Sequence, residues 1–143
     1  ERGYYSDSTE VQRRMVLRLI DKIMRHVDYV FEYTTYYVDD ADYLFVSYGS
    51  TARSTLAVVR DLRGRGIRAG MLKLKTLWPI NESVVGKICS GVSKVFVVEN
   101  NMGKVVWDIQ RIARDVDVYP VSIIDLEVPS PEEIMGVVEK WLR

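Results

Sequence analysis

The sequence predicts one α/β domain built on a mainly parallel β-sheet with helices on both faces. Short, mostly apolar runs alternate four times with amphipathic segments between residues 43 and 143. Such alternation is typical of strand–helix units that build a parallel sheet. A chain of 143 residues is long enough for one domain with its own core and too short for two.

The first 42 residues follow a different pattern. Residues 8–27 carry apolar side chains at helical spacing, which predicts an amphipathic helix. Residues 28–38 are rich in aromatic and β-branched side chains, which favours a strand or an extended connector. We expect residues 1–42 to form an N-terminal helix and an extended lead-in, packed on the same domain, with a soft boundary at 28–42.

Residues 43–143 are predicted to form a βαβαβαβα core. Asn81 is expected to cap the second of its helices, and Ser130 followed by Pro131 marks the start of the last one. Buried parallel strands read as short apolar runs. The strands are expected at 43–48, 67–74, 94–98 and 118–124, and the helices at about 51–63, 82–90, 105–113 and 131–141.

Composition excludes several function classes. The 20 basic residues balance the 20 acidic ones, which argues against a general nucleic-acid-binding protein. The single cysteine, Cys89, rules out an iron–sulfur cluster or a structural zinc site built from this chain's thiolates, and a lone thiol fits the cytoplasm. No apolar run approaches the length of a membrane span. The one histidine, His26, has no nucleophile–base pairing that would suggest a hydrolase.

Ligands of open α/β sheets gather beyond the carboxyl ends of the strands, where three loops are expected. The first contains Gly49, Ser50, Thr51 and Arg53 at a helix N-terminus. Free N–H groups and hydroxyls there are able to hold an anion, such as phosphate or coenzyme A. The structural interpretation is that Gly49 makes the turn while Ser50 or Thr51 caps the helix, and we favour it because most strand–helix corners look this way.

The other two loops leave similar alternatives. Glu99, Asn100 and Asn101 either bind a ligand or a partner, or only supply turn conformations and a cap. A glutamate directly after an apolar strand has to find a partner. In the third loop, Trp78 is either an anchor in the core, which we favour slightly, or an aromatic side chain at an interface.

Five segments follow one another in a specific order: Ser8 to Met15 with Leu19 to Ile23, Asp40-Ala41-Asp42, Val46 to Arg53, Leu74 to Ile80, and Val97 to Gly103. Each motif is weak alone, and the order makes the set specific. Together they resemble the C-terminal part of the α subunits of 2-oxoacid:ferredoxin oxidoreductases. The Leu-Trp-Pro version of the third loop is closer to the 2-oxoglutarate type.

The resemblance implies a fold like the transketolase C-terminal domain, an α/β/α sandwich on a mixed five-stranded sheet. The extra, antiparallel strand would lie within about 30–38. The family converts a 2-oxoacid and coenzyme A to an acyl-CoA and passes electrons to ferredoxin, using thiamine diphosphate, magnesium and iron–sulfur clusters. The Gly-Asp-Gly motif for thiamine diphosphate does not precede Asn100-Asn101.

The resemblance therefore implies an assembly domain that binds none of these cofactors and is inactive alone. Its partners would be the other α-subunit domains and the β subunit, with ferredoxin and coenzyme A reached only through the full complex. The candidate interface or anion-binding residues are Gly49, Ser50, Thr51, Arg53, Trp78, Glu99, Asn100 and Asn101.

Overall fold

The computed structural model describes residues 6–142, so the first five residues of the predicted 1–42 segment lie outside it. It contains a five-stranded sheet in the order β1-β3-β2-β4-β5. β1 (Tyr33–Tyr36) pairs antiparallel with β3, and all the other pairings are parallel. The parallel strands are β2 (Tyr43–Tyr48), β3 (Ala69–Leu74), β4 (Lys94–Glu99) and β5 (Asp117–Ser122). The mixed sheet and the antiparallel strand within 30–38 are confirmed.

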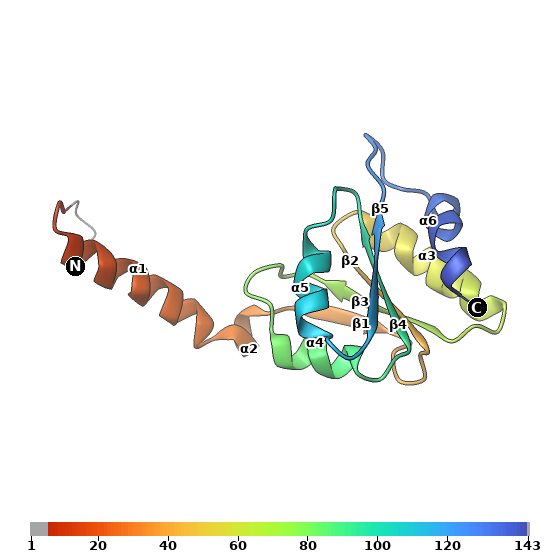
Figure 1. Ribbon diagram of the computed structural model, residues 1–143, viewed down its shortest axis with the longest axis horizontal. Coiled ribbons are helices and arrows are strands. Elements are labelled where there is room, and N and C mark those ends of the chain that lie inside the picture. The colour runs from red at the N-terminus through yellow and green to blue at the C-terminus, as the bar shows by residue number, and fades with distance from the viewer. Residues whose placement is uncertain (1–5, 143) are drawn as a thin grey trace.

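Helices cover both faces of this sheet, which gives three layers (Figure 1). One face packs against α4 (Glu82–Cys89) and α5 (Val105–Ile112) through a core that includes Leu44 and Ile109. The other packs against α3 (Thr51–Gly64) and α6 (Pro131–Val138) through a core that includes Phe45 and Ile134. The central strands β2 and β4 are buried on both faces, which explains their nearly continuous apolar sequences.

The predicted caps of α4 and α6 form as expected. The Asn81 side chain accepts a hydrogen bond from the Val84 N–H at the start of α4. Ser130 and Glu133 form a reciprocal capping box at α6, with Pro131 in the first turn. α6 ends before Trp141, which lies in the 3-10 helix η1 (Glu139–Trp141) and stacks on Tyr119 with ring centroids 4.5 Å apart.

Replacing Ser130 with alanine removes one half of this capping box. We expect the free energy of unfolding to fall by about 1 kcal/mol, because the Glu133 N–H loses its acceptor. Urea denaturation followed by circular dichroism measures the change. The matched control is Ser93→Ala at an exposed position, where a loss of the same size would show that the cap is not the cause.

Residues 28–38 differ in part from the prediction. Only Tyr33–Tyr36 form a strand, whereas Val27–Val30 form a short helix, α2. Tertiary contacts override the strand-like composition here, because Asp28 accepts a hydrogen bond from Asn81 Nδ2 at 2.6 Å and Phe31 is buried in the core. The lead-in thus joins the domain through its second half.

The N-terminal helix forms, but its position differs from the expectation that it packs on the domain. α1 spans Thr9–Met24, is capped by Ser8 and contains no buried residue. In Figure 1 it projects away from the sheet, and α2 is the element next to it. Helical periodicity specifies that an apolar face exists, not which surface covers it.

Candidate functional site: the carboxyl edge of the sheet

The strand connections diverge at the carboxyl ends of β2 and β4. From β2 the chain runs through α3 to β3 on one side, and from β4 it runs through α5 to β5 on the other. When the chain leaves two neighbouring parallel strands toward opposite sides of the sheet, the loops that follow them separate. Ligands of open α/β sheets usually bind between such loops. In this protein Tyr48 ends β2 and Glu99 ends β4.

Glu99 places a carboxylate of the chain itself at this point, against the start of α5. Its side chain is only 1% exposed. Oε2 accepts from the N–H of Lys104 at 3.1 Å and of Val105 at 3.0 Å, and Oε1 accepts from the N–H of Val106 at 3.0 Å. These are the free donors of the α5 N-terminus, which attract an anion. The hydrogen-bonding partner that we expected for Glu99 is therefore the first turn of α5.

Two side chains complete the network around Glu99. The Tyr48 hydroxyl donates to Glu99 Oε2 at 3.0 Å and accepts from Asn101 Nδ2 at 2.8 Å. Asn101 Oδ1 accepts from the N–H of Gly103 at 2.7 Å, which fixes the turn. The Tyr48–Glu99–Asn101 cluster thus ties the ends of two strands to a helix start. Of these, the sequence did not single out Tyr48, because a tyrosine at a strand end carries no local signal for a partner 51 positions away.

The pKa values in the cluster follow from its geometry. Burial alone would raise the pKa of Glu99, but the N–H groups of Val105, Val106 and Lys104 and the Tyr48 hydroxyl together hold it below its ordinary value. Burial, followed by the neighbouring Glu99 carboxylate, raises the pKa of Tyr48. At neutral pH the cluster therefore contains a carboxylate and a neutral phenol, which are matched as acceptor and donor.

Tyr48→Phe removes one donor to this carboxylate and leaves the ring in place. We expect a loss of about 1–3 kcal/mol in the free energy of unfolding, because hydrogen bonds to charged groups are the stronger class. Chemical denaturation at pH 7 measures it. Tyr43→Phe on the same strand is the control, since its hydroxyl makes no hydrogen bond within residues 6–142. Equal losses in both variants would contradict the assignment.

Asn100 connects two loops at this edge. Its Nδ2 donates to the Glu127 carbonyl at 2.9 Å, and its Oδ1 accepts from the Asp125 N–H at 3.1 Å. The loop after β4 and the loop after β5 are therefore held side by side. Met102 on the first and Leu126 on the second are 86% and 104% exposed. The sequence did not mark either one, although an apolar residue between two acids, as at 125–127, is a signal for an exposed loop.

Trp78 lies at the same edge, after β3, and is 61% exposed. The slight preference for a core anchor is wrong, because Pro79 and Asn81 are the buried members of this loop. Asn81 is fixed from two sides, by Val84 and by Asp28. The loop thus has its own anchor and leaves the indole facing outward.

The first loop, at the start of α3, differs from its predicted capping. Gly49 has φ +58 and makes the turn, as expected. Ser50 occupies the cap position without a side-chain hydrogen bond, and Thr51 is buried at 5% exposure. Neither hydroxyl caps the helix, so this part of the prediction is wrong.

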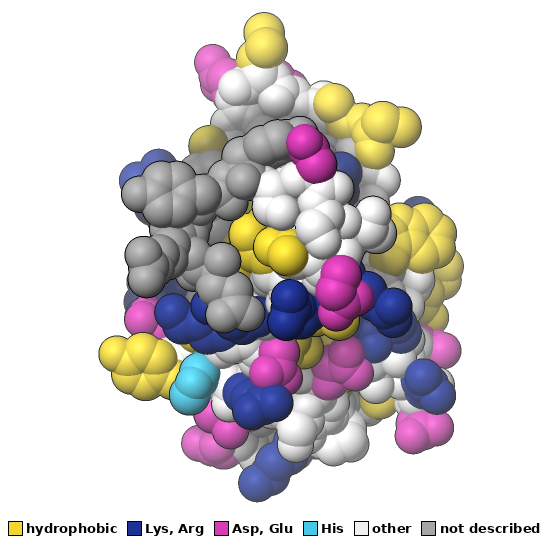
Figure 2. All heavy atoms as spheres, turned by 90° about the vertical axis from the view of Figure 1, so that its left-hand side faces the viewer, with side chains coloured by type: hydrophobic (Ala, Val, Ile, Leu, Met, Phe, Trp, Pro, Cys, Tyr) yellow, Lys and Arg dark blue, Asp and Glu magenta, His cyan; other side chains and the backbone are white. Residues whose placement is uncertain are grey.

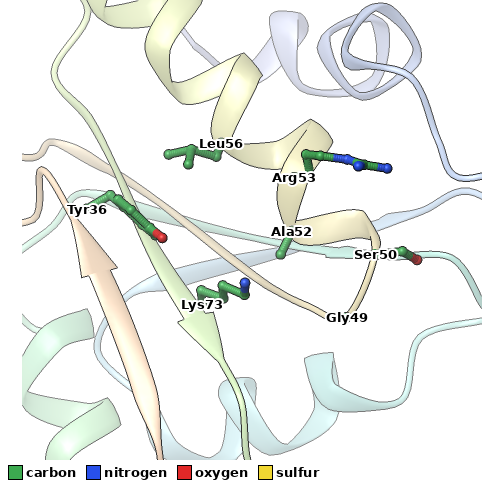
Figure 3. Close-up of a pocket in the computed structure, with 7 residues that line it drawn as sticks. All are labelled: Tyr36, Gly49, Ser50, Ala52, Arg53, Leu56 and Lys73. Atoms are coloured by element: carbon green, nitrogen blue, oxygen red, sulfur yellow. The ribbon is translucent and has the colours of Figure 1, made fainter.

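A hollow of about 510 Å³ lies beside this turn, between α3 and the strands β1 and β3 (Figure 3). Tyr36 and Lys73 line it from the strands, and Arg53 lines it from α3 but extends away from them in this view. Thr51, which the anion-binding alternative requires, is not among its lining residues. The alternative is therefore not favoured.

The described residues offer no cluster of side chains that would hold a metal ion or an iron–sulfur cluster. Between residues 6 and 142 no three His, Cys, Asp or Glu side chains lie together as a metal site. Cys89 is buried, and burial raises the pKa of its thiol to about 11, so it is an inert packing residue. In the same span, no helix is both long and apolar enough to cross a bilayer.

Comparison with solved structures agrees with this architecture. A 2-oxoglutarate:ferredoxin oxidoreductase from Magnetococcus marinus, with 2-oxoglutarate, coenzyme A and succinyl-CoA bound, matches all of this chain and 25% of its own, with a TM-score of 0.79 and 20% identity. A split-gene transketolase, in an inactive tetramer of four beta subunits, matches 78% of this chain and 41% of its own. The TM-score is 0.65 and the identity is 18%. The expected transketolase-C-like fold is confirmed.

Curated relatives match over the same span. The 2-oxoglutarate synthase subunit KorA of Methanothermobacter marburgensis is 36% identical over 95% of this chain, and that of Methanothermobacter thermautotrophicus is 36% identical over all of it. The ketoisovalerate oxidoreductase subunit VorB of the latter organism is 31% identical over 69%. The chain spans only 37% and 39% of the length of the two KorA subunits. The family model "Pyruvate:ferredoxin oxidoreductase core domain II" matches residues 41–133. The chain therefore belongs to the core domain II family of the 2-oxoacid:ferredoxin oxidoreductases, as the sequence motifs predicted.

Proposed function

We propose that this chain is an assembly domain of a 2-oxoacid:ferredoxin oxidoreductase α subunit, with 2-oxoglutarate as the substrate of the whole enzyme. The KorA relatives support the choice of 2-oxoglutarate. In this proposal the domain carries no catalytic residue. It holds the enzyme's other domains in place while they perform the coenzyme A-dependent oxidative decarboxylation.

One observation carries the proposal: exposed apolar side chains lie on three loops at the carboxyl edge of the sheet. These loops follow β3, β4 and β5, which all end at that edge because they run parallel. Exposed apolar side chains along one edge of a domain are typical of a protein interface. We define the strand-end surface as Leu77, Trp78, Met102, Ile124 and Leu126.

The Glu99 cluster supports the non-catalytic part of the proposal. In related sheet architectures a ligand anion is bound by the helix N-terminus at the crevice. Here the α5 N–H groups already bind the Glu99 carboxylate. A substrate anion would have to displace a buried group with a lowered pKa, which is energetically unfavourable.

The partners in this proposal are the other domains of the α subunit and the β subunit. They would supply thiamine diphosphate, magnesium and the iron–sulfur cluster, and ferredoxin and coenzyme A would meet only the full complex. In this proposal the candidate residues Gly49, Ser50, Arg53, Asn100 and Asn101 would form the polar border of the strand-end surface, whereas Thr51 and Glu99 are buried. A cytoplasmic location fits the free thiol of Cys89.

Turnover measurements test the proposal. The purified chain is assayed for 2-oxoglutarate-dependent reduction of a viologen dye in the presence of coenzyme A, thiamine diphosphate and magnesium. The complete α- and β-subunit enzyme is the positive control. We expect dye reduction by the complete enzyme and none by the chain alone. Dye reduction by the chain alone would refute the non-catalytic role.

A further inference from the structure

The outward face of α1 is a large apolar surface that the described part of the chain leaves uncovered. Val16, Leu19, Ile20 and Met24 lie on one side of this helix, and each is about half exposed. Burying apolar side chains of this size stabilises a protein, because their surface is removed from water. A helix that leaves four such side chains in water lacks the packing that normally stabilises it.

The bend between α1 and α2 adds a hollow to this face. Leu19, Ile23, Tyr29 and Val30 form most of its wall, and its volume is about 520 Å³. Tyr29 is 89% exposed at its rim. A hollow of this volume is large enough to accept an apolar side chain from a partner, as interface pockets do. We call the face and the hollow together the α1 docking face.

Charge selects among possible partners. Residues 9–25 contain five basic and two acidic side chains. Both acids form ion pairs within the helix, Glu10 with Arg14 and Asp21 with Arg25. Figure 2 views the molecule from this end and shows Lys and Arg side chains across its middle, with Asp and Glu side chains among and below them and hydrophobic groups above and below. A second copy of α1 would bring two basic helices together, whereas a partner with carboxylates would pair with the surplus charge.

The lengths of the relatives leave room for such a partner within one protein. The match to the KorA subunit of Methanothermobacter thermautotrophicus covers all of this chain, α1 included, and only 39% of that subunit. More than half of that subunit is further polypeptide. A covalently linked domain is present at high effective concentration, which favours docking over association with a membrane surface.

We propose that the α1 docking face seats in an apolar groove bordered by Asp and Glu side chains on another domain of the same oxidoreductase. This inference rests on the proposed function, since it requires that larger enzyme. It adds a second contact to the strand-end surface. α1 would then contact the rest of the enzyme at one position, and the strand-end loops would contact it at the carboxyl edge of the sheet.

Site-specific photo-cross-linking in the complete enzyme tests the inference. A benzophenone amino acid is placed at Leu19 on the docking face, at Arg14 on the opposite side of α1, and at Leu126 on the strand-end surface. Cross-linked peptides are identified by mass spectrometry. We expect Leu19 to cross-link to a segment that contains acidic residues on another domain, at least tenfold more than Arg14 does. Leu126 reports separately on the proposed function.

The outcomes separate the two proposals. Cross-links from Leu126 with none from Leu19 would overturn the α1 inference and leave the assembly role standing. Cross-links from Leu19 to α1 of a second copy, or to added lipid vesicles, would also overturn it. If neither position cross-links to another domain, both proposals fail. Hydrogen exchange adds an independent reading: α1 amides should exchange at least tenfold more slowly in the complete enzyme than in the separate chain.

Discussion

Replacing Glu99 with glutamine is expected to lower the free energy of unfolding by about 3 kcal/mol, more than any exposed polar substitution in this chain. The glutamine amide keeps the shape but turns an NH₂ group toward N–H donors that have no other acceptor. Val105, Val106 and Lys104 at the start of α5 and the Tyr48 hydroxyl all lose part of their bonding. The loss also includes the favourable interaction of a negative charge with the helix N-terminus.

Urea denaturation at pH 7 measures this loss, and Glu127→Gln is the matched control. Glu127 is exposed, and only its backbone takes part in the hydrogen bonds of the edge loops. We expect the control to change the unfolding free energy by less than about 0.5 kcal/mol. A similar, small change in both variants would show that Glu99 does not fix α5.

The same variant has a defined pH dependence. In the unfolded chain Glu99 titrates near the ordinary value of about 4.3, and in the folded protein its pKa is lower. The ionised carboxylate therefore contributes its full stability above the unfolded value, and the contribution is lost as the pH falls through the folded value. We expect the difference between wild type and Glu99→Gln to shrink between pH 7 and pH 3. A constant difference would contradict the assigned charge state.

Trp78→Ala is expected to produce the largest effect on assembly. Tryptophan is enriched among the side chains that dominate interfaces, and truncating such a residue costs about 2–4 kcal/mol of binding. That corresponds to a roughly 30- to 1,000-fold weaker association between the subunits. Because Trp78 is 61% exposed in this domain, the fold itself should be unaffected.

Sedimentation of the complete enzyme over a range of concentrations measures the subunit association in this experiment. Trp107→Ala is the matched control, because Trp107 is 70% exposed on α5 outside the three strand-end loops. We expect the control to change the association by less than about threefold. If the two variants weakened assembly equally, the effect would reflect exposed indole groups in general and not the strand-end surface.

Local chemistry explains which parts of the fold were predictable. Ser130 with Pro131 and Glu133 marks a helix start within four residues, and Tyr43–Tyr48 is recognisable as a buried strand from its own composition. Val27–Val30 was not predictable in this way, because its helical form depends on Asp28 reaching Asn81, 53 positions later in the chain. Composition favoured a strand there, and a tertiary contact decided otherwise.

The same distinction applies to the candidate site. The sequence indicated that Glu99 needs a partner, but only the folded chain brings Tyr48 and the α5 N–H groups to it. The sequence identified the apolar stripe of α1 but not the surface that would cover it, because periodicity describes one helix and not its neighbour. For Trp78 the loop sequence does not encode which side faces the core, since Pro79 and Asn81 act as the anchors.

Hydrogen exchange on this domain, alone and within the complete oxidoreductase, tests the central claim most directly. The claim is that the carboxyl edge of the sheet docks against other parts of the enzyme. The account predicts slower exchange on assembly in residues 76–79, 99–103 and 123–128, with little change at the opposite edge around 64–68. Equal exchange in the two states at all three strand-end loops would contradict it.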